Sequence, residues 1–291
     1  MSQKKIKKVV FPVGGLGTRF LPATKSLPKE MLPVFNKPLI QYAFEEAVNA
    51  GIEEFIFITG RNKNSINNHF DHAYELREVL NKKSKQTELE LTTKWMPQAG
   101  QIAFIRQQEP LGLGHAVWCA RNFIGDEPFA VILADELLKS ESGFLKEMVE
   151  TYEAQGQADA NIMGVYPVAK EHTNKYGIIA YSQEGQQLKI TDMVEKPEPQ
   201  DAPSNLALVG RYILQPGIFA ELAKQEKGSG GEIQLTDAMA KLNNGQNFYA
   251  AKFAGERFDC GNPLGFLEAN IAFGHAAYPE QVAELVKKYH A

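Results

Sequence analysis

Cysteine is scarce in this chain of 291 residues, and histidine forms no recognisable cluster. The two cysteines, Cys119 and Cys260, cannot build a disulfide framework and lack the spacing of a metal site. The six histidines form no HExxH or similar group. We therefore expect neither a disulfide-stabilised fold nor a metal centre built from cysteine and histidine. Cys260 is expected to be a small buried residue and not a nucleophile, because no positive neighbours argue for a lowered thiol pKa.

Long apolar runs and an excess of positive charge are also missing. Four lysines lie within residues 1–8, but the apolar run that follows is interrupted at Pro12, so it is too short for a signal peptide or a membrane-spanning helix. A net charge of −4 argues against general nucleic-acid binding. The composition, 44% hydrophobic and 23% charged, is that of an ordinary soluble protein. We expect a cytoplasmic protein with no nucleic-acid and no membrane partner.

The segment from Lys8 to Pro38 carries the strongest signal. Val9–Phe11 is an apolar run typical of a buried strand, and a glycine-rich turn follows it. The turn comprises Gly14, Gly15, Leu16, Gly17 and Thr18. Glycine lets backbone N–H groups approach a ligand closely, and successive N–H groups in such a turn form a concavity for anions. Three cations come next, Arg19, Lys25 and Lys29. This combination predicts a polyphosphate site, and the plainer alternative is a turn with solvated cations beside it.

The glycine turn matches neither of two common fingerprints. Gly15 and Gly17 fit the dinucleotide pattern GxGxxG, but the third glycine would fall at Phe20. No glycine of the turn is followed at the right spacing by the Gly-Lys pair of a Walker motif. An NAD-linked dehydrogenase is therefore the least favoured reading of this turn.

Apolar periodicity and turn residues predict a mixed α/β fold. Helices are expected at 38–51, 115–122, 143–155 and 279–290, and strands at 54–59, 101–106, 128–133, 160–168, 207–214 and 247–253. A hairpin is expected with arms 175–180 and 189–197 that turn at 183–186. Strand, loop, helix and strand at the start form one βαβ unit, which predicts a parallel sheet with a phosphate-type ligand at its carboxyl edge. Residues 62–93 are expected to be a helical connector with a buried stripe of Phe70, Tyr74, Leu76, Val79 and Leu80.

Two further regions of the chain could carry chemistry. Asp135 lies just beyond an apolar strand, where a carboxylate is well placed for Mg²⁺, although capping of the next helix is an equally good explanation. Residues 107–116 form a flexible lip with amide groups that could read a flat base, and a side-chain amide with backbone groups would match the edge of a uracil. Gln108 alone could instead be a solvent-facing glutamine, and His115 is better explained as a helix-start or core residue than as a catalyst.

Three strings in the chain resemble one known family. GGLGTRFLPATKSLPKEMLP begins at Gly14, PLGLGHA begins at Pro110 and VEKP begins at Val194. They resemble the sugar-phosphate nucleotidylyltransferases, and within them the bacterial UTP–glucose-1-phosphate uridylyltransferases, along almost the whole chain. The chain departs from that family at Gly14 and at Ala134, where alanine and proline respectively are more usual.

The resemblance implies both a fold and a reaction. It implies a Rossmann-like mixed, mostly parallel sheet flanked by helices, of the nucleotide-diphospho-sugar transferase type, with a small β-rich sugar-binding lobe. Residues 1–291 would form a single domain with a nucleotide-binding half at about 1–158, a sugar-phosphate part at 159–262 and C-terminal helices at 263–291. The reaction would transfer a nucleotidyl group from UTP to glucose 1-phosphate by Mg²⁺-assisted in-line attack, giving UDP-glucose and pyrophosphate without a covalent intermediate. A homodimer or homotetramer is expected.

The resemblance also assigns residues to roles. Arg19, Lys29, Lys196 and Asp135 would be catalytic, and Asp135, with Asp259 less firmly, would hold the metal. Nucleotide binding would fall to Gly14, Gly15, Leu16, Gly17, Thr18, Lys25, Gln108 and Gly112. Sugar binding would fall to Gly177, Glu195 and Gly210, with Glu232 and Asp237 near the same lobe. Neighbouring strand residues point to opposite faces, so Glu195 and Lys196 can share a ligand only if Pro197 bends the chain. Without the resemblance they would be a solvated charge pair.

Two rival functions stay open at this point. A thymidylyltransferase is close, because thymine presents the same hydrogen-bonding edge and one methyl group gives only modest discrimination. A catalytically silent relative that binds nucleotide sugar and regulates another enzyme is the second. The charged residues expected to act on phosphates are all present, which argues against the silent relative.

Overall fold

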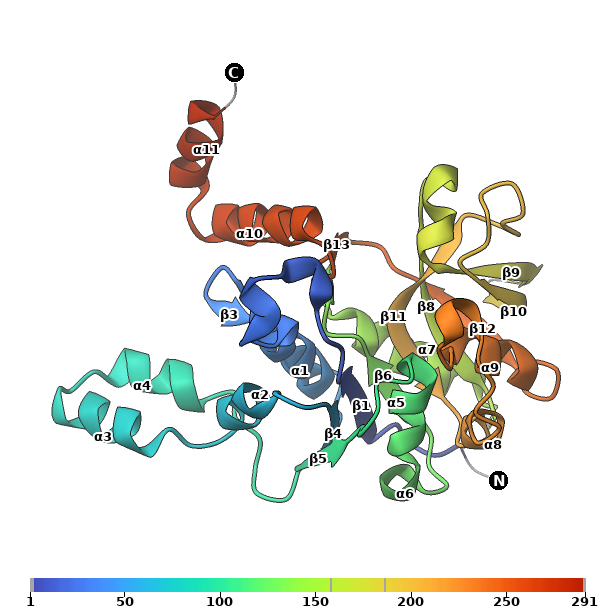
Figure 1. Ribbon diagram of the computed structural model, residues 1–291, viewed down its shortest axis with the longest axis horizontal. Helices are drawn as coiled ribbons and strands as arrows, with labels where there is room; N and C mark the ends of the chain where they lie inside the picture. The colour runs from blue at the N-terminus through green and yellow to red at the C-terminus, as the bar shows by residue number, and fades with distance from the viewer. Residues whose placement is uncertain (1–2, 158, 186, 290–291) are drawn as a thin grey trace.

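The computed structural model describes residues 3–157, 159–185 and 187–289, and within them a nine-stranded sheet forms the centre of the molecule (Figure 1). The strands lie in the order β5-β4-β1-β6-β11-β8-β12-β10-β9. Their bounds are β1 Lys8–Val13, β4 Glu54–Thr59, β5 Ile102–Arg106, β6 Phe129–Ile132, β8 Asn161–Pro167, β9 Gly177–Glu184, β10 Gln187–Glu195, β11 Leu206–Leu214 and β12 Phe248–Lys252. Two small two-stranded sheets accompany it, made of β2 Pro33–Val34 with β3 Lys37–Pro38 and of β7 Glu136–Lys139 with β13 Glu256–Asp259.

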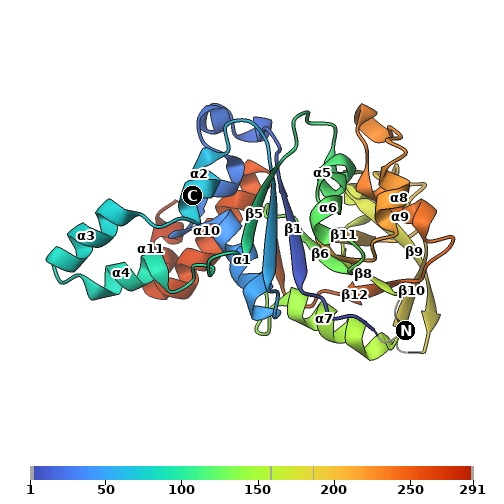
Figure 2. The ribbon, with the colours of Figure 1, turned by 90° about the horizontal axis from the view of Figure 1, so that it is seen from below.

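Helices cover both faces of the sheet (Figure 2). Their bounds are α1 Leu39–Asn49, α2 Asn64–His69, α3 Tyr74–Lys82, α4 Gln86–Thr93, α5 Leu113–Cys119, α6 Arg121–Ile124, α7 Phe144–Gln155, α8 Ile218–Leu222, α9 Leu235–Leu242, α10 Pro263–Ala277 and α11 Pro279–Lys288. Phe44 of α1 and Phe144 of α7 belong to an apolar cluster on one face of the sheet. Val117 of α5 and Met239 of α9 belong to a second cluster on the other face. Burial of these two clusters is the main source of stability, because it removes apolar surface from water.

Parallel pairing joins β5, β4, β1 and β6 on one side of the sheet. Val9, Val10 and Phe11 of β1 are fully buried, as expected for a parallel strand covered on both faces. α1 lies between β1 and β4, and Gly51 beyond its end has a φ of 82°, which glycine adopts without steric cost. The predicted βαβ unit is confirmed, and it places the glycine turn at the carboxyl edge of β1.

β11 joins the parallel part of the sheet to the rest. Its nine residues are all buried, and it pairs antiparallel with β6 on one side and β8 on the other. β10 pairs antiparallel with both β12 and β9. The mixed α/β fold is confirmed, but antiparallel pairs take a larger share than expected, because a hairpin such as β9–β10 needs no helical crossover. The hairpin turn expected at 183–186 includes Gln186, which lies outside the described residues.

The arm formed by α3 and α4 differs from the sequence-based expectation (Figures 1 and 2). Phe70 and Leu80 are buried as predicted, but the predicted burial of Tyr74, Leu76 and Val79 is wrong, because these three side chains are exposed. α3 and α4 pack on each other and project from the body of the molecule, so most of their surface faces solvent instead of the core.

The β7–β13 ribbon is a further element that the sequence analysis did not predict. Its antiparallel register places Asp259 opposite Glu136. α10 begins soon afterwards, where the Asn262 side chain accepts a hydrogen bond from the Gly265 N–H and caps the helix. The predicted terminal helix at 279–290 is present as α11, which ends at Lys288, and residue 290 lies outside the described residues. Within the described part of the chain, no helix is long and apolar enough to span a membrane.

Candidate active site

The glycine turn after β1 forms one wall of a cavity of about 500 Å³. Gly17 has a φ of 66°, a left-handed conformation that starts a short 3₁₀ turn at Thr18. Most of the residues expected to bind nucleotide line this cavity, together with two of the residues expected to be catalytic. They are Gly14, Gly15, Leu16, Gly17, Thr18 and Gly112, with Lys29 and Asp135. Segments that lie about a hundred residues apart in the sequence therefore meet here, as the carboxyl edge of a parallel sheet allows.

Lys29 and Asp135 form an ion pair in this cavity. Lys29 Nζ lies 2.5 Å from Asp135 Oδ2, and about a quarter of each side chain is exposed. Burial lowers the pKa of Lys29, but attraction to Asp135 and to Glu30 outweighs burial and holds the pKa above its ordinary value. Burial likewise raises the pKa of Asp135, and the Lys29 ammonium overrides it and lowers the pKa. Both groups are therefore charged at neutral pH.

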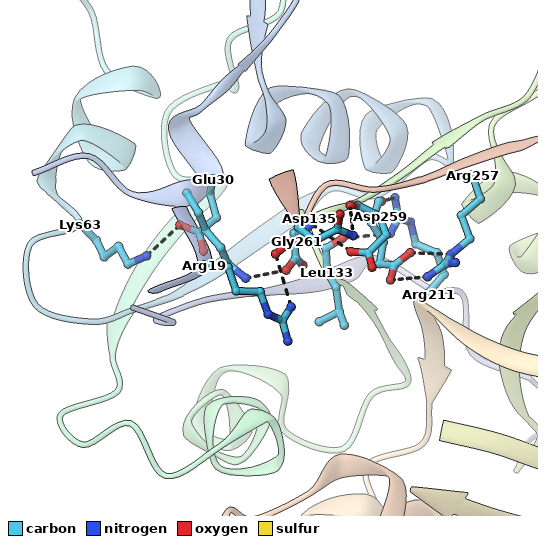
Figure 3. Close-up of polar contacts among 12 residues, drawn as sticks. Arg19, Glu30, Lys63, Leu133, Asp135, Arg211, Arg257, Asp259 and Gly261 are labelled. Carbon is cyan, nitrogen blue, oxygen red and sulfur yellow. Dashed lines mark hydrogen bonds and ion pairs between the residues drawn. The ribbon is translucent and has the colours of Figure 1, made fainter. Parts of the chain in front are cut away.

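Asp259 and Arg19 reach the same place from elsewhere in the chain (Figure 3). Arg19 Nη1 donates to the carbonyl oxygen of Gly261 at 3.4 Å, and the Gly261 N–H donates to Asp259 Oδ1 at 3.0 Å. A Cβ atom on Gly261 would lie 3.0 Å from Asp259 Oδ1 and 3.2 Å from Asp135 Oδ2. Two carboxylates and a guanidinium thus surround a point where only glycine leaves room.

This pair of carboxylates suits a divalent cation. Mg²⁺ prefers hard oxygen ligands and is usually held by one or two carboxylates, with phosphate and water oxygens completing its shell. Asp135 and Asp259 offer that minimum. No group of three or more histidine, cysteine, aspartate or glutamate side chains in residues 3–157, 159–185 and 187–289 could hold a metal alone. The residues present therefore fit Mg²⁺ delivered with a phosphate ligand and do not form a complete protein cage.

A buried ion pair supports the segment that carries Lys29. Lys63 Nζ lies 2.8 Å from Glu30 Oε2, and both side chains are almost fully buried. Burial raises the pKa of Glu30 more than Lys63 lowers it. Glu30 also lines the cavity, and its buried Oε1 has no hydrogen-bond partner among the described residues. Sequence reasoning gave neither residue a role, because their contact depends on the packing of α2 against the 3₁₀ turn Lys29–Met31.

Arg211 supports the segment that carries Asp135. Its guanidinium is fully buried and forms a bidentate pair with Glu46, with Nη2 at 2.7 Å from Glu46 Oε2. It also donates to the carbonyl oxygens of Leu133 and Glu136, at 3.1 Å and 2.9 Å. These two carbonyls flank Asp135 in the chain, so Arg211 fixes the connection on which Asp135 lies. The sequence held no signal for this role beyond an arginine in an apolar strand.

The glutamine that lines this cavity is Gln107, not its neighbour Gln108. Gln108 is exposed and is not among the residues that line the cavity, whereas Gln107 lines it and is 7% exposed. Gln107 Nε2 donates to the Gly112 carbonyl oxygen and to His115 Nδ1, both at 3.1 Å. Because the carbonyl can only accept, this contact orients the amide and leaves Oε1 free to accept from a ligand. Strand alternation explains the change: Gln107 follows β5 in an inward position and Gln108 points out.

The structure also shows where two other residues with expected binding roles lie, Lys25 and Glu232. Lys25 is exposed at the end of a short 3₁₀ turn and does not line the cavity. Glu232, expected near the sugar lobe, lines the same cavity as the glycine turn, because its backbone neighbour Ile233 is hydrogen-bonded to Leu111 and Gly114 of the opposite lip. Glu232 therefore lies against Gly112, where a Cβ atom on that glycine would come within 2.8 Å of it.

The residues expected to bind sugar phosphate form a second group on β9 and β10. Lys196 Nζ lies 3.3 Å from Glu195 Oε1, and 45% of the Lys196 side chain is exposed. A Cβ atom on Gly177 would lie 3.2 Å from Glu195 Oε2. Lys196 has a φ of 47°, so the chain does turn before Pro197 as the shared-ligand hypothesis requires. The space beside Gly210 is filled by Leu133 and Glu136, so in this structure the glycine serves close packing of β11.

The fold and this site together define a class. A glycine turn over a parallel sheet, a lysine and an arginine around it and two convergent carboxylates are suited to act on the phosphates of a nucleotide. The chain matches the nucleotidyl transferase family over residues 8–274, and it belongs to that family.

Three individual relatives are similar to this chain over nearly its full length. The chain is 51% identical over 271 residues to the UTP–glucose-1-phosphate uridylyltransferase of Bacillus subtilis, covering 93% of this chain and 91% of the relative. It is 41% identical to a UTP-bound UGPase from Acinetobacter baumannii, with a TM-score of 0.86 and coverage of 97% and 98%. A UDP-glucose pyrophosphorylase complexed with UDP-glucose is 43% identical, with a TM-score of 0.83 and coverage of 93% and 99%. The resemblance noted from the three sequence strings is confirmed.

A more distant neighbour shares the fold alone. The structure of a putative glucose-1-phosphate thymidylyltransferase from Bacillus anthracis is 22% identical, with a TM-score of 0.66 and coverage of 91% and 94%.

Proposed function

We propose that this protein transfers the uridylyl group of UTP to glucose 1-phosphate, releasing pyrophosphate and forming UDP-glucose. The observation that carries the proposal is the cavity in which the glycine turn, Lys29 and Asp135 meet, with Arg19 and Asp259 beside it. The Bacillus subtilis relative is named for UTP and glucose 1-phosphate, and the match to it covers 93% of this chain.

The reaction depends more on stabilising the negative charge of the phosphates than on transferring a proton. The attacking atom is a phosphate oxygen of glucose 1-phosphate, which is largely dianionic at neutral pH because its second pKa is about 6. It forms a bond to the α-phosphorus of UTP while the bond from that phosphorus to the bridging oxygen breaks, and pyrophosphate leaves with the electron pair. No general base and no covalent intermediate is needed. Positioning and stabilisation of charge supply most of the catalysis in such reactions.

Each charged group has a place in this scheme. The N–H groups of the glycine turn, with Lys29 and Arg19, would hold the triphosphate and stabilise the departing pyrophosphate, and Lys25 would assist from the surface. Asp135 and Asp259 would hold Mg²⁺. Bound there, Mg²⁺ would neutralise charge on the reacting phosphates.

Base recognition is assigned to Gln107 and to the backbone at Gly112. Both N–H groups of the Gln107 amide already have partners, so Oε1 is left to accept from the N3–H of uracil. This replaces the assignment of Gln108.

The sugar phosphate is assigned to Lys196, with Glu195 accepting from sugar hydroxyls beside Gly177. Division of the single domain into nucleotide and sugar-phosphate halves stays a prediction, as does a cytoplasmic location. A homodimer or homotetramer is also proposed, supported by the apolar groove between α10 and α11. Its lining includes Leu267, Ile271, Leu285 and Tyr289.

A pyrophosphate-release assay tests the proposed function. Purified protein should release pyrophosphate from UTP only when glucose 1-phosphate and Mg²⁺ are both present, and UDP-glucose should appear in equal amount. Equal turnover of ATP or GTP would contradict the assignment of the base site. No release from any nucleoside triphosphate would favour the silent, regulatory relative.

The thymidylyltransferase alternative is tested in the same assay with dTTP. The comparisons place such a protein only at the level of a shared fold, so UTP is expected to be the better substrate. A higher kcat/KM with dTTP than with UTP would reverse the assignment.

A further inference from the structure

Lys196 is held in an unusual backbone conformation by one neighbour. Its φ of 47° is in the left-handed region, which strains the backbone of a residue with a side chain. Its N–H donates to the carbonyl oxygen of Tyr176 at 3.0 Å. Tyr176 lies at the start of β9, directly before Gly177. The direction in which Lys196 leaves the chain therefore depends on where Tyr176 lies.

The Tyr176 side chain is in turn held by Arg257. The guanidinium carbon of Arg257 lies 4.6 Å from the centre of the Tyr176 ring, and Nη1 donates to the phenol oxygen at 3.5 Å. Arg257 belongs to β13, which is far from β9 in the sequence and outside the main sheet. This contact is a bridge between the strand pair that carries Lys196 and the ribbon that carries Asp259.

Arg257 itself is fixed on the side of the metal carboxylates (Figure 3). Its Nε and Nη2 each donate to a Glu136 carboxylate oxygen at 2.8 Å, and both side chains are nearly buried. A bidentate pair of this kind sets both distance and orientation. Glu136 directly follows Asp135, and Asp259 lies two residues after Arg257. The position of the Arg257 guanidinium is therefore tied to the positions of Asp135 and Asp259, the two carboxylates that converge at Gly261.

We propose that Arg257 is a positioning residue that, through Tyr176, sets the place of Lys196 relative to Asp135 and Asp259. The inference rests on the proposed function, in which Lys196 holds the attacking phosphate. In-line transfer requires the nucleophile within a narrow range of distance and angle, and a displacement of about 1 Å can cost a hundredfold in rate. The Arg257–Tyr176 contact would fix the position of the phosphate held by Lys196 relative to the phosphates held near Asp135 and Asp259.

The sharpest variant is Tyr176→Leu, because it removes the bridge and keeps the Arg257–Glu136 pair and the backbone carbonyl. We expect the KM for glucose 1-phosphate to rise about tenfold and kcat to fall, with the KM for UTP unchanged within about twofold, since only the sugar-phosphate group is displaced. Isothermal titration with UDP-glucose should show the same loss of affinity. Tyr176→Phe keeps the ring under the guanidinium and should retain most of the activity.

Arg257 is tested by two changes. Arg257→Lys should keep the charge near Glu136 but lose the bidentate geometry, and it should show the same selective rise in the KM for glucose 1-phosphate. Arg257→Met alone would leave Glu136 buried and unpaired, so it is combined with Glu136→Gln to preserve folding. Glu256→Gln is the matched control on the same strand. It breaks only the exposed Lys139–Glu256 pair and should leave both KM values unchanged.

A double-variant cycle separates positioning from general structural damage. In a Lys196→Ala background, Tyr176→Leu should weaken UDP-glucose binding no further, because residues that act through one group are non-additive. An equal further loss in that background would overturn the proposal, and so would an unchanged KM for glucose 1-phosphate in Tyr176→Leu. Failure of the proposed function would look different, since the wild-type protein would then not release pyrophosphate from UTP and glucose 1-phosphate.

Discussion

The proposed nucleotide side and the proposed sugar-phosphate side of this site each present a lysine, and the two lysines are held very differently. Lys29 lies inside a cavity and is paired at 2.5 Å with Asp135. Lys196 lies at the end of a hairpin strand and is nearly half exposed, and its ammonium pairs with the neighbouring Glu195 at 3.3 Å. The buried ion pairs Lys63–Glu30 and Arg211–Glu46 support the segments that carry Lys29 and Asp135. The nucleotide side is thus preorganised by long-range charge pairs, whereas the sugar side depends on local backbone and on the bridge through Tyr176.

The largest expected effect is a loss of stability when the Lys63–Glu30 ion pair on the nucleotide side is broken. Lys63→Met would leave the Glu30 carboxylate buried and unpaired, which typically costs about 3–5 kcal/mol. Urea unfolding should show this loss in the free energy of unfolding. The double variant Lys63→Met/Glu30→Gln should recover most of it, because the uncompensated charge is gone. An unchanged midpoint in the single variant would mean that the pair contributes little.

Removal of a reacting-site cation should affect rate and not folding. Lys196→Ala and Arg19→Ala should each lose about 3–4 kcal/mol of transition-state stabilisation, a factor of about a hundred or more in kcat/KM. Circular dichroism should remain that of the wild type. Lys25→Ala is the comparison variant, and it should lose far less because Lys25 is exposed outside the cavity. Near-normal turnover in Lys196→Ala would remove Lys196 from the mechanism.

Lys29 pairs with Oδ2 of Asp135, one of the two carboxylate oxygens that could ligate a metal. Lys29→Met should therefore raise the affinity of the free protein for Mn²⁺ by about tenfold or more, since a fixed positive charge beside Asp135 is removed. Catalysis by the same variant should fall. An electron paramagnetic resonance titration without nucleotide measures the metal affinity directly. Equal or weaker Mn²⁺ binding would show that the ion pair does not compete with the metal.

The smallest expected effect is a pH dependence at the base end of the cavity. Burial lowers the pKa of His115 below its ordinary value of 6.5, so the imidazole is uncharged at neutral pH. The hydrogen bond from Gln107 Nε2 selects the tautomer in which Nδ1 accepts. As pH falls through that lowered pKa, protonation of Nδ1 removes the acceptor and frees the amide. The KM for UTP should then rise about threefold, as expected for loss of a roughly 0.5–1 kcal/mol net hydrogen bond. His115→Gln should abolish this rise, whereas an unchanged pH profile in the variant would exclude His115 as its source.

Much of the fold followed from patterns that span only a few residues. The strand 54–59 and the helix beginning near Pro38 were predicted almost to the residue, because apolar runs and glycine or proline punctuation act locally. The exposed stripe on α3 was mispredicted for the opposite reason. An apolar periodicity shows that a helix could be buried on one face, but whether a sheet lies against that face depends on the rest of the chain.

The sequence by itself determined the glycine turn, the cations after it and a carboxylate at a strand end, since these features are set by residue type and short spacing. Only the tertiary structure decided that Gln107 and not Gln108 faces the cavity, and that Asp259 meets Asp135. It alone revealed the supporting arginines and the Lys63–Glu30 pair. These contacts join residues separated by 33 to 165 positions. Such contacts depend on how β7, β11 and β13 come together in space, and no local periodicity encodes that arrangement.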